Sequence, residues 1–398
     1  MPSLSIAGYF PFPRVKIVRQ SVAEDATSAW IGIEPDLRCS PLCSCCKGKA
    51  TRVHSATHRV VRDLNLAGAK VFIRYNYRKV FCSRCSGIYV EEQEFVLPYA
   101  RVTKRLARYI HQLCKKMTIT DVAKHFGLDW KTVKNIDKHF LQEEFGQTDY
   151  NDLHIIAIDE ISVRKGYRYY TVVIDIASGR VLWMGEGRAK ETLDAFFGPM
   201  TTEQRHSIEA VVMDMWPAYI NRVKHWCPGA RIVFDLFHVV KEFHKVIDKV
   251  RNAEYRRACA EDKQVIKGSK YLLLKNKENL RAEERSHLKQ LLRLNEKLST
   301  LYILKDALKK IWSYRYPARA KKALDRWCSI AYESDIPQLH VFANRLKAHE
   351  YGILNHCLYP ISTGKLEGMN NKIKVIHRNA YGFHDPEYFI YKVKQAFP

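Results

Sequence analysis

No stretch of this sequence is apolar for long. None approaches the ~18 apolar residues that would indicate a membrane-spanning helix, although 46% of the 398 residues are hydrophobic. The first dozen residues contain no basic residue and lack the pattern of a secretory signal. We therefore expect a cytoplasmic protein without a membrane segment, with apolar residues for two to four domains at roughly 100–200 residues each.

Acidic residues are scarce relative to basic ones. The chain has 66 Lys and Arg against 42 Asp and Glu, which gives a formal net charge of +24. A surface of this charge attracts polyanions, because neutralising phosphates releases their condensed counterions. Membrane surfaces also attract cations, but without a spanning segment the composition favours nucleic acid as the partner.

A disulfide framework is not expected. Eleven cysteines in a chain without a secretory signal are typical of thiols or metal ligands in a reducing cytosol. Cys43 with Cys46, and Cys82 with Cys85, form two Cys-x₂-Cys pairs that can close a tetrahedral thiolate site. They predict a structural Zn²⁺ site. The alternating run 71–81 predicts a strand leading into the second pair, as in the hairpin of a zinc ribbon.

The zinc assignment leaves alternatives open. The 35 residues between Cys46 and Cys82 exceed the usual spacing of about 15–20, and free buried thiols are the other interpretation. Three further residues compete as ligands, namely Cys39, Cys45 and His54. The isolated cysteines are expected in cores, namely Cys114, Cys227, Cys259, Cys328 and Cys357.

Proline is absent from 229 to 316, and Gly268 is the only glycine inside that stretch. Leucines there recur largely at helical spacing. We therefore predict an all-helical insertion over 239–356. The apolar repeat does not keep a strict heptad, which argues against a long coiled coil.

Short apolar strands recur between 154 and 235. They are expected at 154–161, 169–176, 181–185, 209–213 and 231–234, with helices at 190–200 and 216–225. Gly179 lies in a plausible hairpin turn between the second and third strands. This order indicates a mixed α/β sheet, and it is the strand order of an RNase H-like fold.

A helix-turn-helix is expected in 119–139. Gly127 suits the turn because glycine adopts positive φ at little cost, and Asp129 is a good N-cap for the second helix. Ten Lys or Arg against three Asp in 101–140 favour nucleic acid over an ordinary helical hairpin. The side chains expected to face a major groove are Lys131, Thr132, Lys134, Asn135 and Lys138.

These patterns predict a multidomain α/β protein. The expected parts are an irregular N-terminal lead-in (1–38), a zinc-binding ribbon-like module (39–98), a helix-turn-helix DNA-binding domain (99–150), the first part of an RNase H-like core (151–238), the helical insertion (239–356) and the C-terminal part of the core (357–398).

Three acidic residues form the candidate catalytic set. Asp159 and Asp214 each end an apolar run, and Glu367 begins a basic, helix-like stretch. The first and fourth strands of the predicted sheet are neighbours, so the two aspartates are expected to meet at one edge. Mg²⁺ binds a few carboxylates, and two such ions can hold the attacking and leaving oxygens of a phosphodiester. Each aspartate taken alone is more often a turn or helix cap.

Asp235 and His238 close the fifth strand and are accessory candidates. His238 can orient water or phosphate there, and packing beneath the helical insertion is the equal alternative. Glu160 competes with its neighbour if the strand register shifts by one residue. Asp152 and Asp175 are less well placed.

Together these segments resemble bacterial insertion-sequence transposases of the DDE class, in the ISL3 group. The likeness covers nearly the whole chain, including the cysteine pairs and the helix-turn-helix. It is carried by Ala157-Ile158-Asp159-Glu160, Met213-Asp214-Met215-Trp216, Phe234-Asp235-Leu236-Phe237-His238, Glu367-Gly368-Met369-Asn370-Asn371-Lys372-Ile373-Lys374 and Tyr381-Gly382-Phe383.

The resemblance implies a triad of Asp159, Asp214 and Glu367 that holds Mg²⁺ or Mn²⁺. It also implies double-stranded DNA as partner, both terminal inverted repeats and target DNA, and a homodimer or larger multimer assembled on it at the nucleoid. Water would cleave a phosphodiester at the element's end. The freed 3′-hydroxyl would then attack target DNA in the same pocket, without a covalent enzyme intermediate.

Further DNA contacts are expected near this set. Related transposases stack an aromatic residue on a flipped base, and Trp216 is the candidate here, with a core or helix-start tryptophan as the alternative. Lys372, Lys374 and Arg378 are expected to follow the DNA backbone or to form a solvated face. A transposase-derived DNA-binding regulator without cleavage, and an RNase H-like nuclease or resolvase, are the competing functions.

Overall fold

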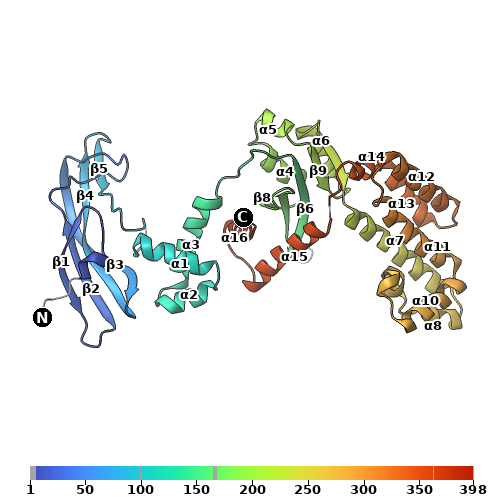
Figure 1. Cartoon of the computed structure of the whole chain (residues 1–398), viewed down its shortest axis with the longest axis horizontal. Coiled ribbons are helices and arrows are strands. Elements are labelled where there is room, and N and C mark those ends of the chain that lie inside the picture. The colour runs from blue at the N-terminus through green and yellow to red at the C-terminus, as the bar shows by residue number, and fades with distance from the viewer. Residues whose placement is uncertain (1–5, 99, 165–167, 362, 398) are drawn as a thin grey trace. The chain divides into compact units, whose positions relative to one another are not determined.

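The chain forms two compact units, Met1–Gly146 and Gln147–Pro398, and each contains a β-sheet with associated helices (Figure 1). The computed structural model describes residues 6–98, 100–164, 168–361 and 363–397.

The first unit is built on a five-stranded sheet of order β1-β2-β4-β3, in which β5 pairs with the end of β4. Its strands are β1 (Val15–Val22), β2 (Ser28–Pro35), β3 (Arg52–Leu66), β4 (Ala69–Cys82) and β5 (Gly87–Val90). β3 and β4 form a long antiparallel hairpin, whereas β2 runs parallel to β4. Alternate residues of β2 and β4 pack with Phe10 and Phe95, so one face of the sheet is covered by a core.

The expectation of an irregular lead-in over 1–38 was wrong. β1 and β2 lie in this segment, and β2 contributes Ala29, Ile31 and Ile33 to the core. The alternation that marks a strand is present in β2, but it is short and contains Gly32, which weakens the strand signal. The strand forms because its apolar residues are buried against β4, a partner distant in sequence.

Three helices complete the first unit: α1 (Lys104–Cys114), α2 (Ile119–Phe126) and α3 (Trp130–Phe145). Gly127 ends α2 with φ +63°, and the Asp129 side chain accepts the backbone N–H of Lys131 at the start of α3. Both findings confirm the expected turn and cap. Val122, Phe126 and further apolar side chains from all three helices form a separate small core.

Asp63 of β3 anchors α1 to the sheet. Its fully buried carboxylate accepts hydrogen bonds from Thr103 Oγ1 at 2.6 Å and from Arg105 Nε at 2.8 Å. An uncompensated buried charge costs several kcal/mol. These bonds therefore fix the start of α1 against the sheet.

The second unit contains a five-stranded sheet of order β10-β9-β6-β7-β8. Its strands are β6 (Ile155–Arg164), β7 (Arg168–Asp175), β8 (Val181–Glu186), β9 (Ala210–Met213) and β10 (Arg231–Phe234). β6, β7 and β8 are antiparallel, whereas β9 and β10 run parallel to β6. All five strands and the mixed sheet confirm the sequence-based prediction.

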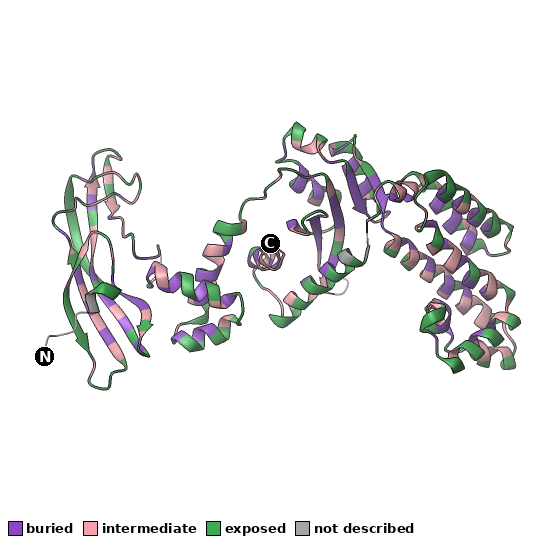
Figure 2. Ribbon diagram, viewed as in Figure 1, coloured by how far each residue is buried: buried purple, intermediate pink, exposed green. Residues whose placement is uncertain are grey.

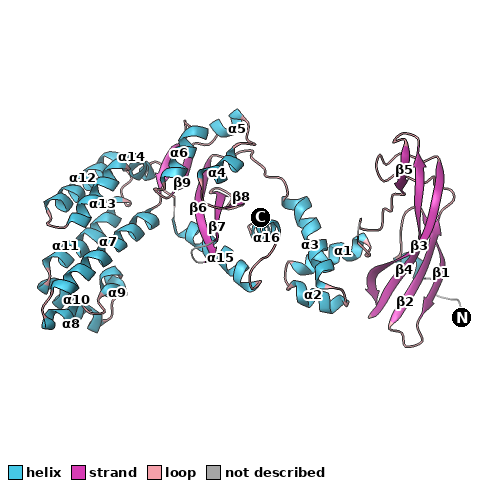
Figure 3. Cartoon of the chain, turned by 180° about the vertical axis from the view of Figure 1, so that it is seen from behind, coloured by secondary structure: helices cyan, strands magenta, loops and turns pink. Residues whose placement is uncertain are grey.

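Helices cover both faces of this sheet (Figure 3). The helices around the sheet are α4 (Lys190–Phe197), α5 (Thr202–His206), α6 (Pro217–Trp226), α15 (Thr363–Asn379) and α16 (Pro386–Ala396). Ile156 and Ile158 of β6 face the core shared with α4 and α6. Ala157 and Ile161 face the core shared with α15 and α16. The alternation of β6 therefore decides which residues meet α15.

The predicted helical insertion is present. It comprises α7 (Leu236–Arg257), α8 (Ala260–Ile266), α9 (Lys270–Leu274), η2 (Lys277–Asn279), α10 (Ala282–Leu294), α11 (Glu296–Ile311), α12 (Pro317–Glu333), α13 (Pro337–Ala348), α14 (Glu350–Leu354) and η3 (Asn355–Cys357). Its helices bury one side against each other (Figure 2). Gly352 packs so closely on Phe234 that a Cβ would lie 2.4 Å from the ring, which joins α14 to β10. Within the described residues, no helix is long and apolar enough to cross a membrane.

Candidate functional site

Three aspartates lie side by side at the edge of the second sheet. Ala157 of β6 pairs with Val212 of β9, so Asp159 and Asp214 follow two residues later in the same register. Phe234 of β10 pairs with Met213 of β9, which places Asp235 next to Asp214. Neighbouring strands are about 4.8 Å apart. The register therefore brings the carboxylates of three strands to one edge.

Side-chain alternation turns these aspartates toward α15. Asp159 has the parity of Ala157, which packs in the core under α15 and α16. Val212 and Val233 belong to the same core, and Asp214 and Asp235 share their parity. Glu160 has the opposite parity and is exposed. The register thus favours Asp159 over Glu160 as the acidic residue of the site.

His238 lies among the three carboxylates. It belongs to the first turn of α7, whose N-cap Asp235 accepts the backbone N–H of Phe237 at 2.7 Å. His238 Nε2 is 3.4 Å from Asp159 Oδ1 and 4.0 Å from Asp235 Oδ2, and its Nδ1 is 3.7 Å from Asp214 Oδ2. The side chain is half-buried. It faces the acidic residues and is not merely packed beneath the insertion.

The C-terminal helix α15 closes the site from a distant part of the sequence. In Figure 1 it lies beside β6. Asn370 of α15 donates its side-chain amide to Asp159. Glu367 lies one turn earlier on α15 and is exposed. Asn370 also has a buried Oδ1 that finds no hydrogen-bond partner among the described residues. Sequence reasoning missed Asn370, although its i+3 spacing from Glu367 places it on nearly the same side of a helix.

The oxygens of this site suit hard cations. Mg²⁺ binds carboxylate and amide oxygens at about 2.1 Å, and paired ions lie about 4 Å apart. Ligands of different ions can therefore be roughly 8 Å apart. Among the described residues the acidic side chains form no group of three with all ligand atoms within 4.8 Å. The oxygen donors that the structure gathers at this edge are the three aspartates and the Oδ1 of Asn370. Glu367 is exposed one turn earlier on the same helix.

Burial and the neighbouring charges shift two pKa values in the site. Burial raises the pKa of Asp235 to about 6, although the hydrogen bond from the backbone of Phe237 acts to lower it. Burial lowers the pKa of His238, but its hydrogen bond with Asp159 and the charges of the three aspartates outweigh this effect. The net pKa of His238 therefore lies above its ordinary value, which favours an imidazolium that partly neutralises the carboxylates.

A second group of side chains surrounds Glu160. Burial raises the pKa of Glu160, and Asp159 and Asp214 are close enough for their charges to raise it further. Arg188 Nη1 is 3.8 Å from Glu160 Oε1. Its guanidinium carbon lies 4.3 Å from the ring centroid of Tyr169 and 5.9 Å from that of Trp216. Trp216 is the N-cap of α6 and is 45% exposed, so it is a helix-start tryptophan and not a core residue. Arg188 was missed because no pattern in the sequence marks it.

The remaining acidic candidates have structural surroundings. Asp175 accepts the backbone N–H groups of Ala177 and Ser178 and shapes the turn after β7. Asp152 is exposed before β6. Neither residue contacts the site edge through any described hydrogen bond or ion pair.

The two cysteine pairs converge in the first unit. Cys43, Cys46, Cys82 and Cys85 have all ligand atoms within 4.8 Å of one another, and the Cys46 and Cys82 sulfurs are 3.6 Å apart. A tetrahedral zinc site with bonds of about 2.3 Å has edges of about 3.8 Å, so the set fits Zn²⁺. The long β3–β4 hairpin between the pairs accounts for their unusual spacing.

The four members of this cluster do not include the competing ligands Cys39, Cys45 and His54, although the Cys45 thiol lies next to Cys85. Of the isolated cysteines, Cys114, Cys227 and Cys328 are buried and Cys357 is half-buried. The expectation that Cys259 is a core residue was wrong, because it is exposed at the N-cap of α8.

The expected DNA-contacting side chains differ in exposure. On α3, Lys131 and Asn135 are exposed, and three more are half-buried: Thr132, Lys134 and Lys138. On α15, Arg378 is exposed and Lys374 half-buried. Lys372 donates to Ala396 O at 2.6 Å and lies over the Phe397 ring. This contact competes with any role of Lys372 on the DNA backbone.

Comparison with known proteins agrees with this arrangement. A family model described as "Transposase" in the ISL3 group matches residues 156–393. The chain belongs to this family. Models for the helix-turn-helix domain of transposase family ISL3 and for the zinc-finger of transposases IS204/IS1001/IS1096/IS1165 match residues 91–141 and 40–85. The protein is thus a DDE transposase with a zinc-finger and a DNA-binding helix-turn-helix. β1 and β2 lie outside the matched ranges.

Two relatives cover most of the chain. The transposase for insertion sequence element IS1001 of Bordetella parapertussis is 41% identical over 360 residues, covering 90% of this chain and 89% of the relative. The transposase for insertion sequence element IS1557 of Mycobacterium tuberculosis is 30% identical over 301 residues, covering 70% of this chain and 67% of the relative.

Proposed function

We propose that this transposase cleaves and joins DNA at a site in which Asp159, Asp214 and Glu367 hold two Mg²⁺ or Mn²⁺ ions. The single observation that carries the proposal is the register of β6 and β9, which sets the two aspartates beside each other. α15 contacts Asp159 through Asn370 and supplies Glu367 from one turn away. The sheet order, with three antiparallel strands followed by two parallel ones, supports an RNase H-like fold.

The chain's own residues position the reacting groups. Asp235 and His238 are accessory: Asp235 caps α7 and so fixes where the imidazole of His238 lies. His238 carries an N–H in either protonation state, and this N–H can orient a phosphate oxygen or a water molecule. Asn370 restricts the rotation of the Asp159 carboxylate. The ions, when bound, supply Lewis-acid stabilisation of charge on the phosphodiester.

DNA is brought to this site by recognition elsewhere in the chain. We assign recognition of the terminal inverted repeats to α3, whose N-terminal half exposes Lys131 and Asn135. Arg378 and Lys374 of α15 are assigned to the DNA backbone, and Trp216 to a base near the cut. Two ends must be joined to one target, so a homodimer or larger multimer is the working assembly. It acts on nucleoid DNA in the bacterial cytoplasm.

The deciding experiment is cleavage of a labelled duplex that contains the element's terminal inverted repeat and its flank, with and without Mg²⁺. Wild-type protein should cut at the element's end only with the metal. Asp159→Asn and Glu367→Gln should abolish cutting, while binding of the repeat is retained. Asp152→Asn, an exposed acid before β6, is the matched control and should cut normally.

Each competing function gives a different result. A transposase-derived regulator would bind the repeat without cutting it under any metal condition. An RNase H-like nuclease or resolvase would cut without preference for the repeat. Near-normal cleavage by Glu367→Gln would remove that residue from the triad.

A further inference from the structure

Two rows of side chains cross the face of the N-terminal sheet that points away from its core. Gly32 of β2 pairs with both Arg19 of β1 and Arg74 of β4, so the two arginines lie in one row across three strands. Trp30 and Phe72 form the next row, with ring centroids 4.8 Å apart and stacked planes. We call this side of the sheet the outer face. It also includes Lys70 of β4.

The outer face continues to the helix-turn-helix. Lys70 lies two residues before Phe72 on β4 and therefore shares its side of the sheet. A Cβ placed on Gly127 would lie 3.2 Å from Lys70 Nζ, so this ammonium contacts the turn between α2 and α3. The start of α3 is the part of a recognition helix that meets base edges. The outer face thus borders the base-reading end of α3 within one compact unit.

The charges on the outer face are available to a ligand. Arg19, Lys70 and Arg74 are exposed, and none has a carboxylate within 4 Å among the described residues. The guanidinium of Arg74 lies 5.7 Å from the Trp30 ring centroid. Such a contact holds a guanidinium in place while leaving its N–H groups exposed. The stacked rings therefore present the cation in a fixed position.

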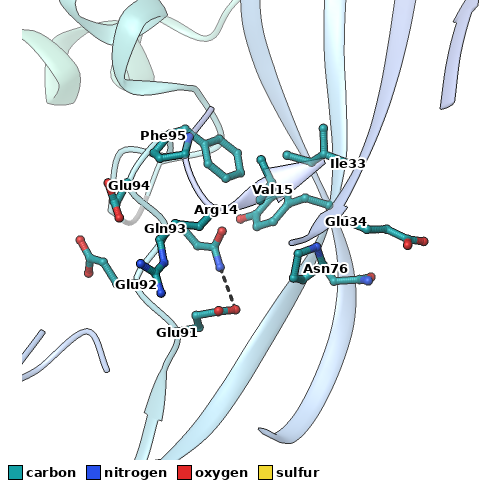
Figure 4. A pocket seen from close by; sticks show the side chains of 13 residues that line it. Arg14, Val15, Ile33, Glu34, Asn76, Glu91, Glu92, Gln93, Glu94 and Phe95 are labelled. Atoms are coloured by element: carbon teal, nitrogen blue, oxygen red, sulfur yellow. Dashed lines mark hydrogen bonds between the residues drawn. The ribbon is translucent and has the colours of Figure 1, made fainter. Parts of the chain in front are cut away.

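The end of the same sheet near Pro35 and Glu91 has a different character. A cavity of about 20 Å³ opens there beside Glu91, Glu92 and Glu94 (Figure 4). Arg78, the cation next to it, forms an ion pair with Glu91. Carboxylates thus gather around this cavity, whereas no carboxylate of the described residues lies within 4 Å of the cations of Arg19, Lys70 or Arg74.

We infer that the outer face is a second DNA-contact surface, which follows the phosphate backbone next to the groove entered by α3. The inference rests on the proposed function, because it assumes that α3 binds the terminal repeat. Arg19 and Arg74 contact phosphates on either side of Gly32. Lys70 extends the contact toward the helix-turn-helix. The β1–β2 hairpin is then part of the DNA-binding surface.

The test measures how affinity depends on salt. Full-length Arg19→Gln/Arg74→Gln protein is titrated with a duplex of the terminal repeat and its flank, and with a scrambled duplex of the same length. Losing two phosphate contacts should lower the slope of log affinity against log salt by about 1.8 and weaken binding about thirtyfold at 0.15 M salt. Hydroxyl-radical protection should disappear only from the backbone next to the α3 contacts.

Controls separate this result from misfolding. Arg38→Gln/Lys47→Gln removes two exposed cations that are ion-paired with Asp36 and Glu92, and it should keep the wild-type slope. Arg19→Lys/Arg74→Lys retains both charges and should restore most of the wild-type slope of log affinity against log salt. A normal zinc content shows that the sheet is folded.

The outcomes are distinct. If the wild type prefers the repeat and the double glutamine variant keeps its slope and protection pattern, the inference is overturned while the proposed function stands. The same holds if this variant changes only the oligomeric state. If the wild type binds neither duplex, both the inference and the proposed function are overturned.

Discussion

Asn370 of α15 donates its side-chain amide to Asp159 of β6, which joins two residues 211 positions apart. The bond orients one of the three aspartates at the sheet edge and fixes the turn of α15 that follows Glu367. Within the part of the chain that the structure describes, the oxygen of the same amide is buried and has no hydrogen-bond partner. Unsatisfied buried polar atoms are rare in folded proteins. This atom therefore marks a place where a ligand is expected.

Asn370→Ala should slow strand cleavage and spare DNA binding. A hydrogen bond to a charged group is worth about 1.5–3 kcal/mol, so loss of Asp159 orientation should reduce the cleavage rate about ten- to hundredfold. Single-turnover cleavage of the labelled terminal duplex measures this. The matched control is Asn371→Ala, which changes an exposed neighbour on the same helix. Equal rates for the two variants would contradict the orienting role.

The second sheet and its acidic edge were predictable because they depend on local patterns. Four of the five strands are short, strongly apolar runs. That β6 and β9 are neighbours in the sheet was expected from the RNase H-like order of strands and helices, and not from the chain order alone. Asp214 and Asp235 directly follow such runs, so the parallel register alone brings them together. Asp159 was found in the same way, although β6 continues past it to Arg164.

Not every contact that completes the site was predictable. His238 was an accessory candidate because of its spacing from Asp235, with packing beneath the insertion as the equal alternative. Asn370 reaches Asp159 only because α15 packs against the sheet, and tertiary packing leaves no periodic signal. The β1–β2 hairpin was missed because β4, the strand that pairs with β2, comes much later in the sequence, after the first cysteine pair and β3. Conversely, the spacing between Cys46 and Cys82 is unusual as a motif, yet the β3–β4 hairpin returns the chain to the same place.

Cys82→Ser should remove zinc and unfold the zinc-binding end of the first sheet. The Cys82 side chain is buried in the four-sulfur cluster, and structural zinc contributes on the order of 10 kcal/mol to folding. Elemental analysis should fall from one Zn per chain to nearly none. Cys45 is exposed and is not one of the four clustered cysteines, so Cys45→Ser protein should keep one Zn per chain. Full zinc content in the Cys82 variant would exclude this ligand set.

Lys131→Ala/Asn135→Ala should reduce the preference for the terminal repeat. Each base contact of this kind contributes about 1–3 kcal/mol of discrimination, so the ratio of specific to scrambled affinity should fall at least tenfold. Competition binding at fixed salt measures the ratio. Gln142→Ala changes an exposed side chain in the last turns of α3 and should leave it unchanged. An unaltered footprint in the double variant would show that α3 does not read the repeat.

Lys305 is a buried lysine in α11 whose charge should make stability depend on pH. Its Nζ donates to Leu273 O at 2.8 Å and to Lys275 O at 2.6 Å. Burial lowers the pKa of Lys305 from 10.5 to about 8, with smaller effects of the charges on Asp306, Lys309, Lys277 and Glu278. The free amine is therefore favoured in the folded state at a pH where the unfolded chain still binds the proton.

The sign of the effect follows from proton binding. Between pH 8 and 10.5 the unfolded state holds more protons at Lys305, so the free energy of unfolding rises with pH. At about 1.4 kcal/mol per pKa unit, the rise contributed by this residue is roughly 3 kcal/mol. Lys305→Met should lack this contribution. At pH 7 the variant should have nearly wild-type stability, because relief of the buried charge offsets the loss of two hydrogen bonds.

Urea unfolding of the metal-loaded protein at pH 7.5 and pH 10 isolates the contribution of Lys305. The difference in unfolding free energy between wild type and Lys305→Met should change by roughly 2.4 kcal/mol over this range in favour of the wild type. Lys310→Met changes an exposed lysine of the same segment, so its difference from the wild type should be constant. A constant difference for Lys305→Met as well would mean that Lys305 keeps an ordinary pKa. Its hydrogen bonds to the carbonyl oxygens of Leu273 and Lys275 would then only cap the end of α9.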